Sequence, residues 1–130
     1  MRNKIQKSML LVIFVTLVTS FSILMTVFYF VNLNSMKEEV KQETIYIQTA
    51  IEIAGTKYLN EMDNVHVETR LTLIDEAGKV LYDSREDEYT FQNHKARKEV
   101  RDAFNHGSGD ALRQSATVGK PTYYYAVLLK

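Results

Sequence analysis

Three arginines in the last third of the chain have the side-chain type and the spacing of an anion site. Arg97 and Arg101 lie one turn apart on an expected short helix. Arg113 shares one face of an expected strand with Ser115. A guanidinium can hold a carboxylate or a phosphate through two parallel hydrogen bonds, and a helix N-terminus adds free N–H groups and partial positive charge. If the strand face turns toward the helix, these side chains form an anion-binding pocket.

The same residues also fit a structural role, and the sequence favours it. Arg113 can pair with Asp83 or Glu99 and fasten a loop to the sheet. A small sheet also fills its own interior with side chains, and Tyr123 and Tyr125 are placed to do so. The pocket nevertheless defines the candidate ligand-binding set. Its members are Arg97, Arg101, Arg113, Ser115, Tyr123 and Tyr125.

Catalytic and metal chemistry have less support. The three histidines lack H-x-x-x-H spacing and cysteine partners, although His94 can approach Asp83. Ser84 is a nucleophile only by type, because no base and orienting group accompany it. The acidic run at 86–88 lacks the Asp/Asn-Gly pattern of a calcium loop and is typical of a solvated loop. We therefore expect no catalytic residue, no metal and no cofactor.

Charge and cysteine content exclude further classes of function. The 130 residues carry 16 basic and 16 acidic side chains, but residues 1–31 hold three of the basic ones and no acid. Residues 32–130 therefore carry a net charge of −3, which does not suit nucleic acid binding. The chain has no cysteine, so disulfides and thiol nucleophiles are excluded.

The run 9–31 predicts a transmembrane helix. It contains no charge, proline or glycine, and a helix of that length spans about 34 Å, enough for a hydrocarbon layer of about 30 Å. Basic residues in the tail 1–8 favour a cytoplasmic N-terminus, which places residues 32–130 outside the cell. The run is long for a cleaved signal peptide, so an uncleaved anchor is favoured over that alternative. Its hydroxyl side chains either bond to their own helix or contact a partner helix.

Beyond the membrane run, an apolar stripe predicts that helix continues. From Leu33 to Met62 the apolar residues step by three or four, a period near 3.6, and Ile45 and Ile53 widen the stripe. We expect this amphipathic helix to lie on a sheet, with part of its face contacting a second copy in a homodimer. The helix should break at 63–64.

The remaining pattern predicts an α+β domain with one antiparallel sheet. The expected order is strand, turn, strand, loop, short helix, strand, turn and strand, at 70–75, 76–79, 80–82, 83–92, 93–105, 111–117, 118–121 and 122–129. Asn93 is the expected helix cap, with Ala96, Val100, Ala103 and Phe104 on the buried face. Both faces of the last strand are apolar, which predicts a central strand. Because the chain stops at the end of this strand, we expect a fragment of a longer protein.

Several stretches together resemble extracytoplasmic PAS-like (Cache-type) sensor domains. Residues 70–84, which include Asp83 and Ser84, resemble the first hairpin of those domains. The later residues resemble the phosphate-regulon and cell-wall type sensor histidine kinases of Gram-positive bacteria. These are Asn93-His94, Arg97, Glu99 and Arg113-Gln-Ser115 before a tyrosine-rich strand. The chain departs from the pattern at Lys98, where such proteins often have proline.

The resemblance implies the signal-input end of a homodimeric membrane receptor. The parent would add a second membrane helix, a HAMP linker, a phosphoacceptor domain and an ATP-binding domain, which the 130 residues lack. This region would not be an enzyme, and a cytoplasmic response regulator would be reached only through those domains. The stimulus would be a small anionic ligand, an ion or an envelope component. The alternative is a bitopic cell-envelope scaffold whose outer domain binds a protein partner.

Overall fold

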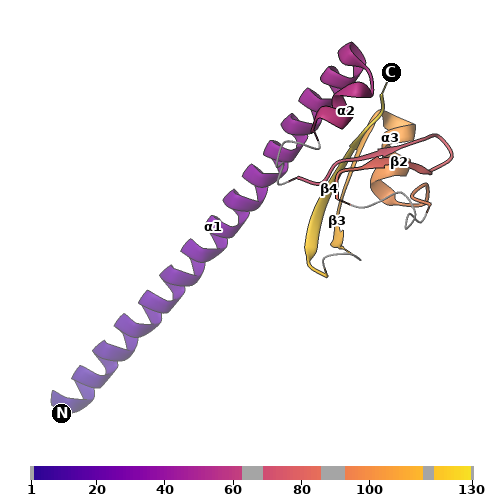
Figure 1. Cartoon of the computed structure of the whole chain (residues 1–130). Helices are drawn as coiled ribbons and strands as arrows, with labels where there is room; N and C mark the ends of the chain where they lie inside the picture. The colour runs from indigo at the N-terminus through magenta and orange to yellow at the C-terminus, as the bar shows by residue number, and fades with distance from the viewer. Residues whose placement is uncertain (1, 63–68, 86–92, 116–118, 130) are drawn as a thin grey trace. The chain divides into compact units, whose positions relative to one another are not determined.

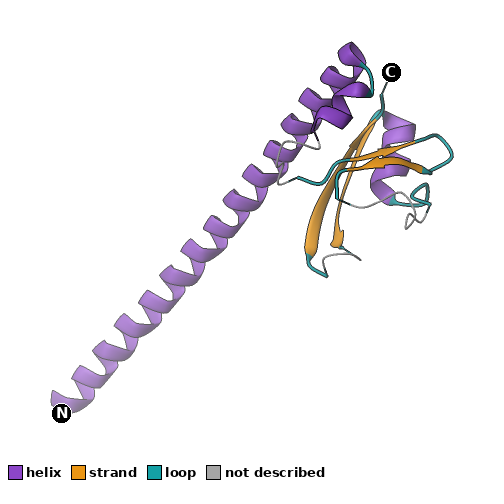
Figure 2. Cartoon of the chain, viewed as in Figure 1, coloured by secondary structure: helices purple, strands orange, loops and turns teal. Residues whose placement is uncertain are grey.

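The computed structural model describes residues 2–62, 69–85, 93–115 and 119–129. It forms two compact units, Met1–Glu38 and Glu39–Lys130. The predicted α+β class is confirmed: a long N-terminal helix is followed by two small antiparallel sheets and short helices (Figures 1 and 2). The elements are α1 (Arg2–Ala54), α2 (Lys57–Met62), β1 (Thr72–Ile74), β2 (Val80–Asp83), α3 (Lys98–His106), β3 (Ser108–Gln114) and β4 (Pro121–Val127).

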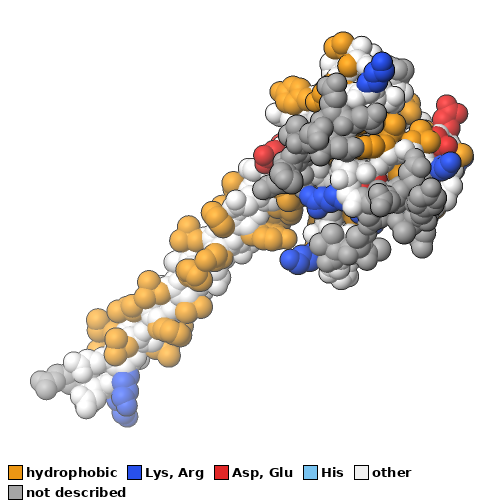
Figure 3. Space-filling view, viewed as in Figure 1, with side chains coloured by type: hydrophobic (Ala, Val, Ile, Leu, Met, Phe, Trp, Pro, Cys, Tyr) orange, Lys and Arg blue, Asp and Glu red, His pale blue; other side chains and the backbone are white. Residues whose placement is uncertain are grey.

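The first unit is the apolar part of α1. Its hydrophobic side chains are exposed around the helix, which is long and apolar enough to cross a membrane, a test that a signal sequence also passes (Figure 3). The hydroxyls of Thr16, Ser22 and Thr26 donate to the carbonyl oxygens of Ile13, Val18 and Ser22, at 2.8, 2.9 and 2.8 Å. Because these hydroxyls are satisfied within their own helix, the helix needs no partner to accommodate them.

The second unit begins with the last turns of α1, which have one buried side. Ile47 is buried, and Val40, Thr44 and Ile51 are half-buried. Ile45 and Ile53, which the sequence added to the stripe, are 47% and 82% exposed and do not pack within the unit. Lys41, Glu43 and Gln48 are also half-buried, so the buried side of these turns includes polar and charged side chains as well as apolar ones.

The helix does not continue to Met62 as the stripe predicted. It ends at Ala54, and Gly55 takes a left-handed conformation with φ of 73° while its N–H donates to the carbonyl oxygen of Ile51 at 2.8 Å. Glycine reaches this conformation without a Cβ clash and is therefore the usual residue just beyond a helix. The chain then starts α2 at Lys57. The expected break at 63–64 lies outside the described residues.

The first sheet is the predicted hairpin. Strands β1 and β2 pair antiparallel with a bulge between Leu73 and Ile74, and Gly78 turns the chain with φ of 85°. Asp83 belongs to β2, although the sequence placed it in the following loop. The acidic run at 86–88 lies outside the described residues.

Helix α3 begins at Lys98, later than predicted. The side chain of Asn93 accepts the Lys95 N–H at 2.9 Å and donates to the carbonyl oxygen of Ala77 at 2.8 Å, so it holds the preceding turn instead of capping the helix. Ala96 is consequently exposed, whereas Val100 and Ala103 are buried and Phe104 is half-buried. Gly107, with φ of 88°, ends the helix as expected.

The second sheet pairs β3 with β4 antiparallel, from Ser108 opposite Val127 to Gln114 opposite Pro121. Strand β3 starts three residues before the predicted Ala111. Gly109 permits this, because a Cβ there would collide with the carbonyl oxygen of Glu99 and come within 2.6 Å of the Asp102 Cβ. Predicted strand residue Thr117 lies outside the described part.

The expected single sheet and the expected central position of the last strand are both wrong for the described residues. β1 and β2 form one two-stranded sheet, and β4 pairs with β3 in another. Apolar side chains on both faces of β4 indicate that both faces are packed against other residues. Packing of the faces does not determine whether a second strand pairs along the free edge, so the apolar pattern did not predict the strand order.

Candidate functional site

One face of the second sheet carries the candidate site. Because opposite residues of an antiparallel pair share a face, Arg113 lies beside Thr122, and Ala111 lies beside Tyr124. Positions 109, 111 and 113 of β3 are half-buried, while the alternate positions are exposed. This face turns toward α3, as the pocket hypothesis required.

Arg113 is held by a carboxylate and an aromatic ring. Its Nη2 donates to Oε1 of Glu99 at 2.9 Å, and its guanidinium carbon lies 3.8 Å from the centroid of the Tyr124 ring. The side chain of Glu99 is 5% exposed and that of Arg113 is 31% exposed. Of the two partners that the sequence offered for Arg113, the structure therefore selects Glu99, which joins α3 to β3.

The pair leaves two buried polar atoms without hydrogen bonds to the described residues. These are Oε2 of Glu99 and Nε of Arg113. They are the two atoms that a side-on, two-bond arginine–carboxylate pair would join. Of the two hydrogen bonds that such an Arg113–Glu99 pair can form, only the one from Nη2 to Oε1 is present.

Arg97 is the N-cap residue of α3 and is half-buried. Its backbone is extended, with φ −67° and ψ 135°, and its side chain makes no capping hydrogen bond. Burial and the nearby Arg113 lower the pKa of Arg97, which Glu99 opposes. Within the described residues its guanidinium has no hydrogen bond or ion pair to a side chain. The guanidinium groups of Arg97 and Arg113 therefore both interact with the carboxylate of Glu99, Arg113 through a hydrogen bond and Arg97 through its charge.

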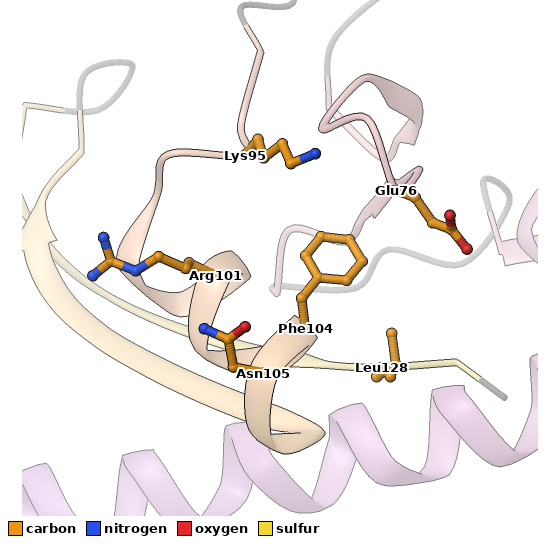
Figure 4. Close-up of a pocket in the computed structure, with 6 residues that line it drawn as sticks. All are labelled: Glu76, Lys95, Arg101, Phe104, Asn105 and Leu128. Carbon is orange, nitrogen blue, oxygen red and sulfur yellow. The ribbon is translucent and has the colours of Figure 1, made fainter.

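Arg101 lies apart from this cluster. It is exposed and lines an open depression of about 410 Å³ with five other residues, namely Glu76, Lys95, Phe104, Asn105 and Leu128. In Figure 4 the Phe104 ring and the Lys95 side chain extend into the same space, whereas the Arg101 guanidinium points away from them. The lining of the depression thus combines two apolar side chains, Phe104 and Leu128, with polar and charged ones.

The other candidate residues lie outside the arginine cluster or support it through the backbone. Ser115 is buried, and its N–H donates to the carbonyl oxygen of Lys120 at 2.9 Å, closing the turn before β4. Tyr123 and Tyr125 lie on the face of β4 opposite to Tyr124. Burial, and then the nearby Asp110, raise the pKa of the Tyr123 hydroxyl. The face that the sequence left out of the pocket therefore supplies its aromatic ring, Tyr124.

The motif residues of the first hairpin build a frame. Asp83, with its side chain 1% exposed, accepts Nε of Arg70 at 2.9 and 3.0 Å and the Thr72 hydroxyl at 2.9 Å. Ser84 Oγ accepts the Leu71 N–H at 3.0 Å. Sequence reasoning missed Arg70, which a cross-strand charge search opposite Asp83 could have found.

His94 links this hairpin to α3. It is 5% exposed, its N–H donates to the carbonyl oxygen of Gly78 at 2.8 Å, and its own carbonyl oxygen accepts the Arg97 N–H at 3.0 Å. The backbone of His94 thus fixes the position of Arg97. The described residues hold no group of three or more His, Cys, Asp or Glu side chains that could bind a metal ion.

Comparisons with family models, curated proteins and solved structures found no match to this chain. The cluster can do one kind of chemistry. Guanidinium groups that exceed their carboxylate partners can bind an anion, whereas nucleophilic catalysis needs a positioned base that this face does not supply among its described residues.

Proposed function

We propose that the chain is the signal-input region of a membrane-bound, two-component sensor histidine kinase, with residues 32–130 forming a PAS-like extracytoplasmic domain. The observation that carries the proposal is the continuity of α1. One helix runs from Arg2 through the apolar segment into the unit that bears the two sheets. A stimulus bound by that unit would then act on the same helix that enters the membrane.

The contacts of α1 within the second unit support this role. Gln48 Nε2 donates to the carbonyl oxygen of Leu128 at 2.9 Å, and the Thr69 hydroxyl donates to Glu43 at 2.7 Å. These hydrogen bonds join the helix to the end of β4 and to the residues before β1. A rearrangement of either sheet would therefore displace groups that are hydrogen-bonded to α1. A stimulus shifts such an equilibrium only through its different affinities for the two arrangements.

Orientation can be tested by cysteine accessibility, which the cysteine-free chain makes simple. Single cysteines replace Lys4 and exposed Lys95 in the full chain, in intact cells. A membrane-impermeant maleimide should label Lys95→Cys only, because residues 32–130 lie outside in the proposal. Labelling of Lys4→Cys alone would place the domain in the cytoplasm and refute it.

Transmission can be tested by inserting Gly-Gly-Ser after Val31 in the full-length receptor. Glycine and serine weaken helix continuity, so the insertion should uncouple the stimulus from autophosphorylation. The matched control inserts three alanines after Val31, which adds the same length but keeps the helix continuous. An unchanged response to stimulus after the Val31 insertion would contradict transmission through the helix.

The coding sequence that follows Lys130 separates the receptor from a scaffold. A second apolar span and a kinase core would support the receptor. A stop codon would instead support a bitopic envelope scaffold whose outer domain binds a protein partner.

A further inference from the structure

We propose that Arg97, at the start of α3, and Arg113, on β3, bind a small oxyanion, with a carboxylate or a phosphate as the group that is recognised. This inference deepens the proposed input function and rests on it for its biological meaning. It concerns the face of β3 and β4 that turns toward α3.

The first argument is the local balance of charge. Arg70 and Asp83 form a closed pair, because Arg70 Nε contacts both carboxylate oxygens. Glu99 is left to balance both Arg113, its direct partner, and Arg97, two residues before it on the chain. Among the residues that the structure describes, the cluster thus has a surplus of one positive charge. An anion with one or two negative charges would remove that surplus.

The second argument is the setting of Arg97. A half-buried cation is unfavourable at the positive end of a helix dipole and near another guanidinium. Both the burial of Arg97 and its neighbour Arg113 act to lower its pKa, so the folded chain opposes the charge there. No described side chain offsets that opposition by a hydrogen bond or an ion pair to Arg97. A bound anion would.

The third argument is the supply of donors. A guanidinium has five N–H donors, and Arg113 uses one of them in its bond to Glu99. Tyr124 lies against the guanidinium and orients its plane, while 31% of the side chain remains exposed to solvent. Arg97 makes no capping bond, and its guanidinium has no hydrogen bond to a described side chain. Two oriented guanidinium groups suit a small planar or tetrahedral oxyanion.

The test is calorimetric titration of the full chain in neutral detergent micelles at low ionic strength. The probes are inorganic phosphate and acetate, titrated separately so that the two kinds of oxyanion are distinguished, with chloride as the ionic-strength control. We expect saturable binding of at least one probe. Arg97→Ala should weaken that binding by about tenfold or more, the change expected when one charge-assisted contact is lost.

Arg101→Ala is the matched control, because Arg101 is an exposed arginine on the same helix that lines the separate depression and is not among the contacts of Arg113 or the charges that act on Arg97. Its binding should equal that of the unmodified chain. Near-ultraviolet circular dichroism should show that both variants are folded. Arg97→Lys keeps the charge and loses the planar fork, so its affinity should lie between those of the unmodified chain and Arg97→Ala.

The proposal is overturned if neither probe binds more tightly than chloride, or if Arg101→Ala weakens binding as much as Arg97→Ala. Either result would leave the insertion test at Val31 untouched. Conversely, binding that depends on Arg97 in a chain that fails the labelling and insertion tests would keep the anion site and refute the receptor.

Discussion

Removing Arg113 should destabilise the second unit more than removing Glu99, although both changes break the same ion pair. Arg113→Ala leaves a carboxylate whose side chain is 5% exposed. Glu99→Ala leaves a guanidinium whose side chain is 31% exposed and which keeps its contact with Tyr124. Water can reach the stranded cation, whereas the stranded anion stays desolvated. The cost of each variant is therefore set by the partner that remains.

The structure allows both costs to be estimated. Breaking a fully buried pair costs about 3–5 kcal/mol, and the partial exposure of Arg113 argues for the lower end, about 3 kcal/mol, for Arg113→Ala. Loss of the contact with Tyr124 adds about 0.5–1 kcal/mol. For Glu99→Ala the hydrated guanidinium reduces the cost to about 1–2 kcal/mol. The double variant leaves neither member of the ion pair without its partner, so it should be more stable than Arg113→Ala alone.

Urea unfolding of the full chain in detergent, followed by near-ultraviolet circular dichroism of tyrosine, measures these differences. The chain has eight tyrosines and no tryptophan, and seven of the tyrosines follow residue 45, so the signal reports on the second unit. With a slope of about 2 kcal/mol/M, the urea midpoint should fall by about 1.8–2 M for Arg113→Ala and by about 0.5–1 M for Glu99→Ala.

Two results would refute this reasoning. Equal midpoints for the two single variants would mean that the carboxylate is as well hydrated as the guanidinium when left alone. Strict additivity in the double variant would mean that the pair is not coupled, because residues in direct contact should show an interaction energy. Tyr124→Phe is the matched control. It keeps the ring under Arg113, so its free energy of unfolding should stay within about 0.5 kcal/mol of that of the unmodified chain.

Three further predictions concern packing and pH. Gly109→Ala should lower the melting temperature more than Gly119→Ala, because its Cβ would meet the backbone of α3 at a cost of about 2–3 kcal/mol, whereas Gly119 has open space and only a left-handed φ of 68°, at about 1–2 kcal/mol. Burial raises the pKa of the Tyr123 hydroxyl above 10.0, so the neutral hydroxyl contributes to the free energy of unfolding below pH 10, and this contribution is lost as the pH rises through the pKa of the folded chain. Tyr123→Phe should therefore make the melting temperature less dependent on pH in the alkaline range. The hydrogen bond from Lys98 lowers the pKa of Asp102 below 3.8, so the ionised carboxylate contributes to the free energy of unfolding above pH 3.8, and this contribution is lost as the pH falls through the pKa of the folded chain. Asp102→Asn should therefore make the melting temperature less dependent on pH in the acid range. An acid melting curve equal to that of the unmodified chain would contradict this prediction.

Local signals predicted part of this fold well. The uncharged run at 9–31 predicted a long helix, and the turn with Gly78 predicted the first hairpin. The end of α3 at Gly107 was also predicted, because a left-handed glycine beyond a helix is recognisable from a short window.

Other features depended on competition that a local pattern does not resolve. The apolar stripe continued past Gly55, yet the helix ends there because one left-handed glycine redirects the chain. Asn93 had the residue type of a cap. Its side chain instead forms hydrogen bonds with the backbone of Ala77 and Lys95, because residues 93–95 pack closely against Gly78. A sequence shows that a side chain can make a bond, and the fold decides which of several it makes.

The sequence by itself determined the apolar segment, the α+β class and the presence of arginines that can hold an anion, because these follow from composition and short-range periodicity. Only the tertiary structure decided that Arg113 pairs with Glu99 and stacks on Tyr124, that Arg101 lines a separate depression, and that Arg97 has no ion pair with a described residue. The physical reason is that pairing depends on which face of β3 meets α3. That choice is made by contacts far apart in the chain, such as the approach of Gly109 to Glu99.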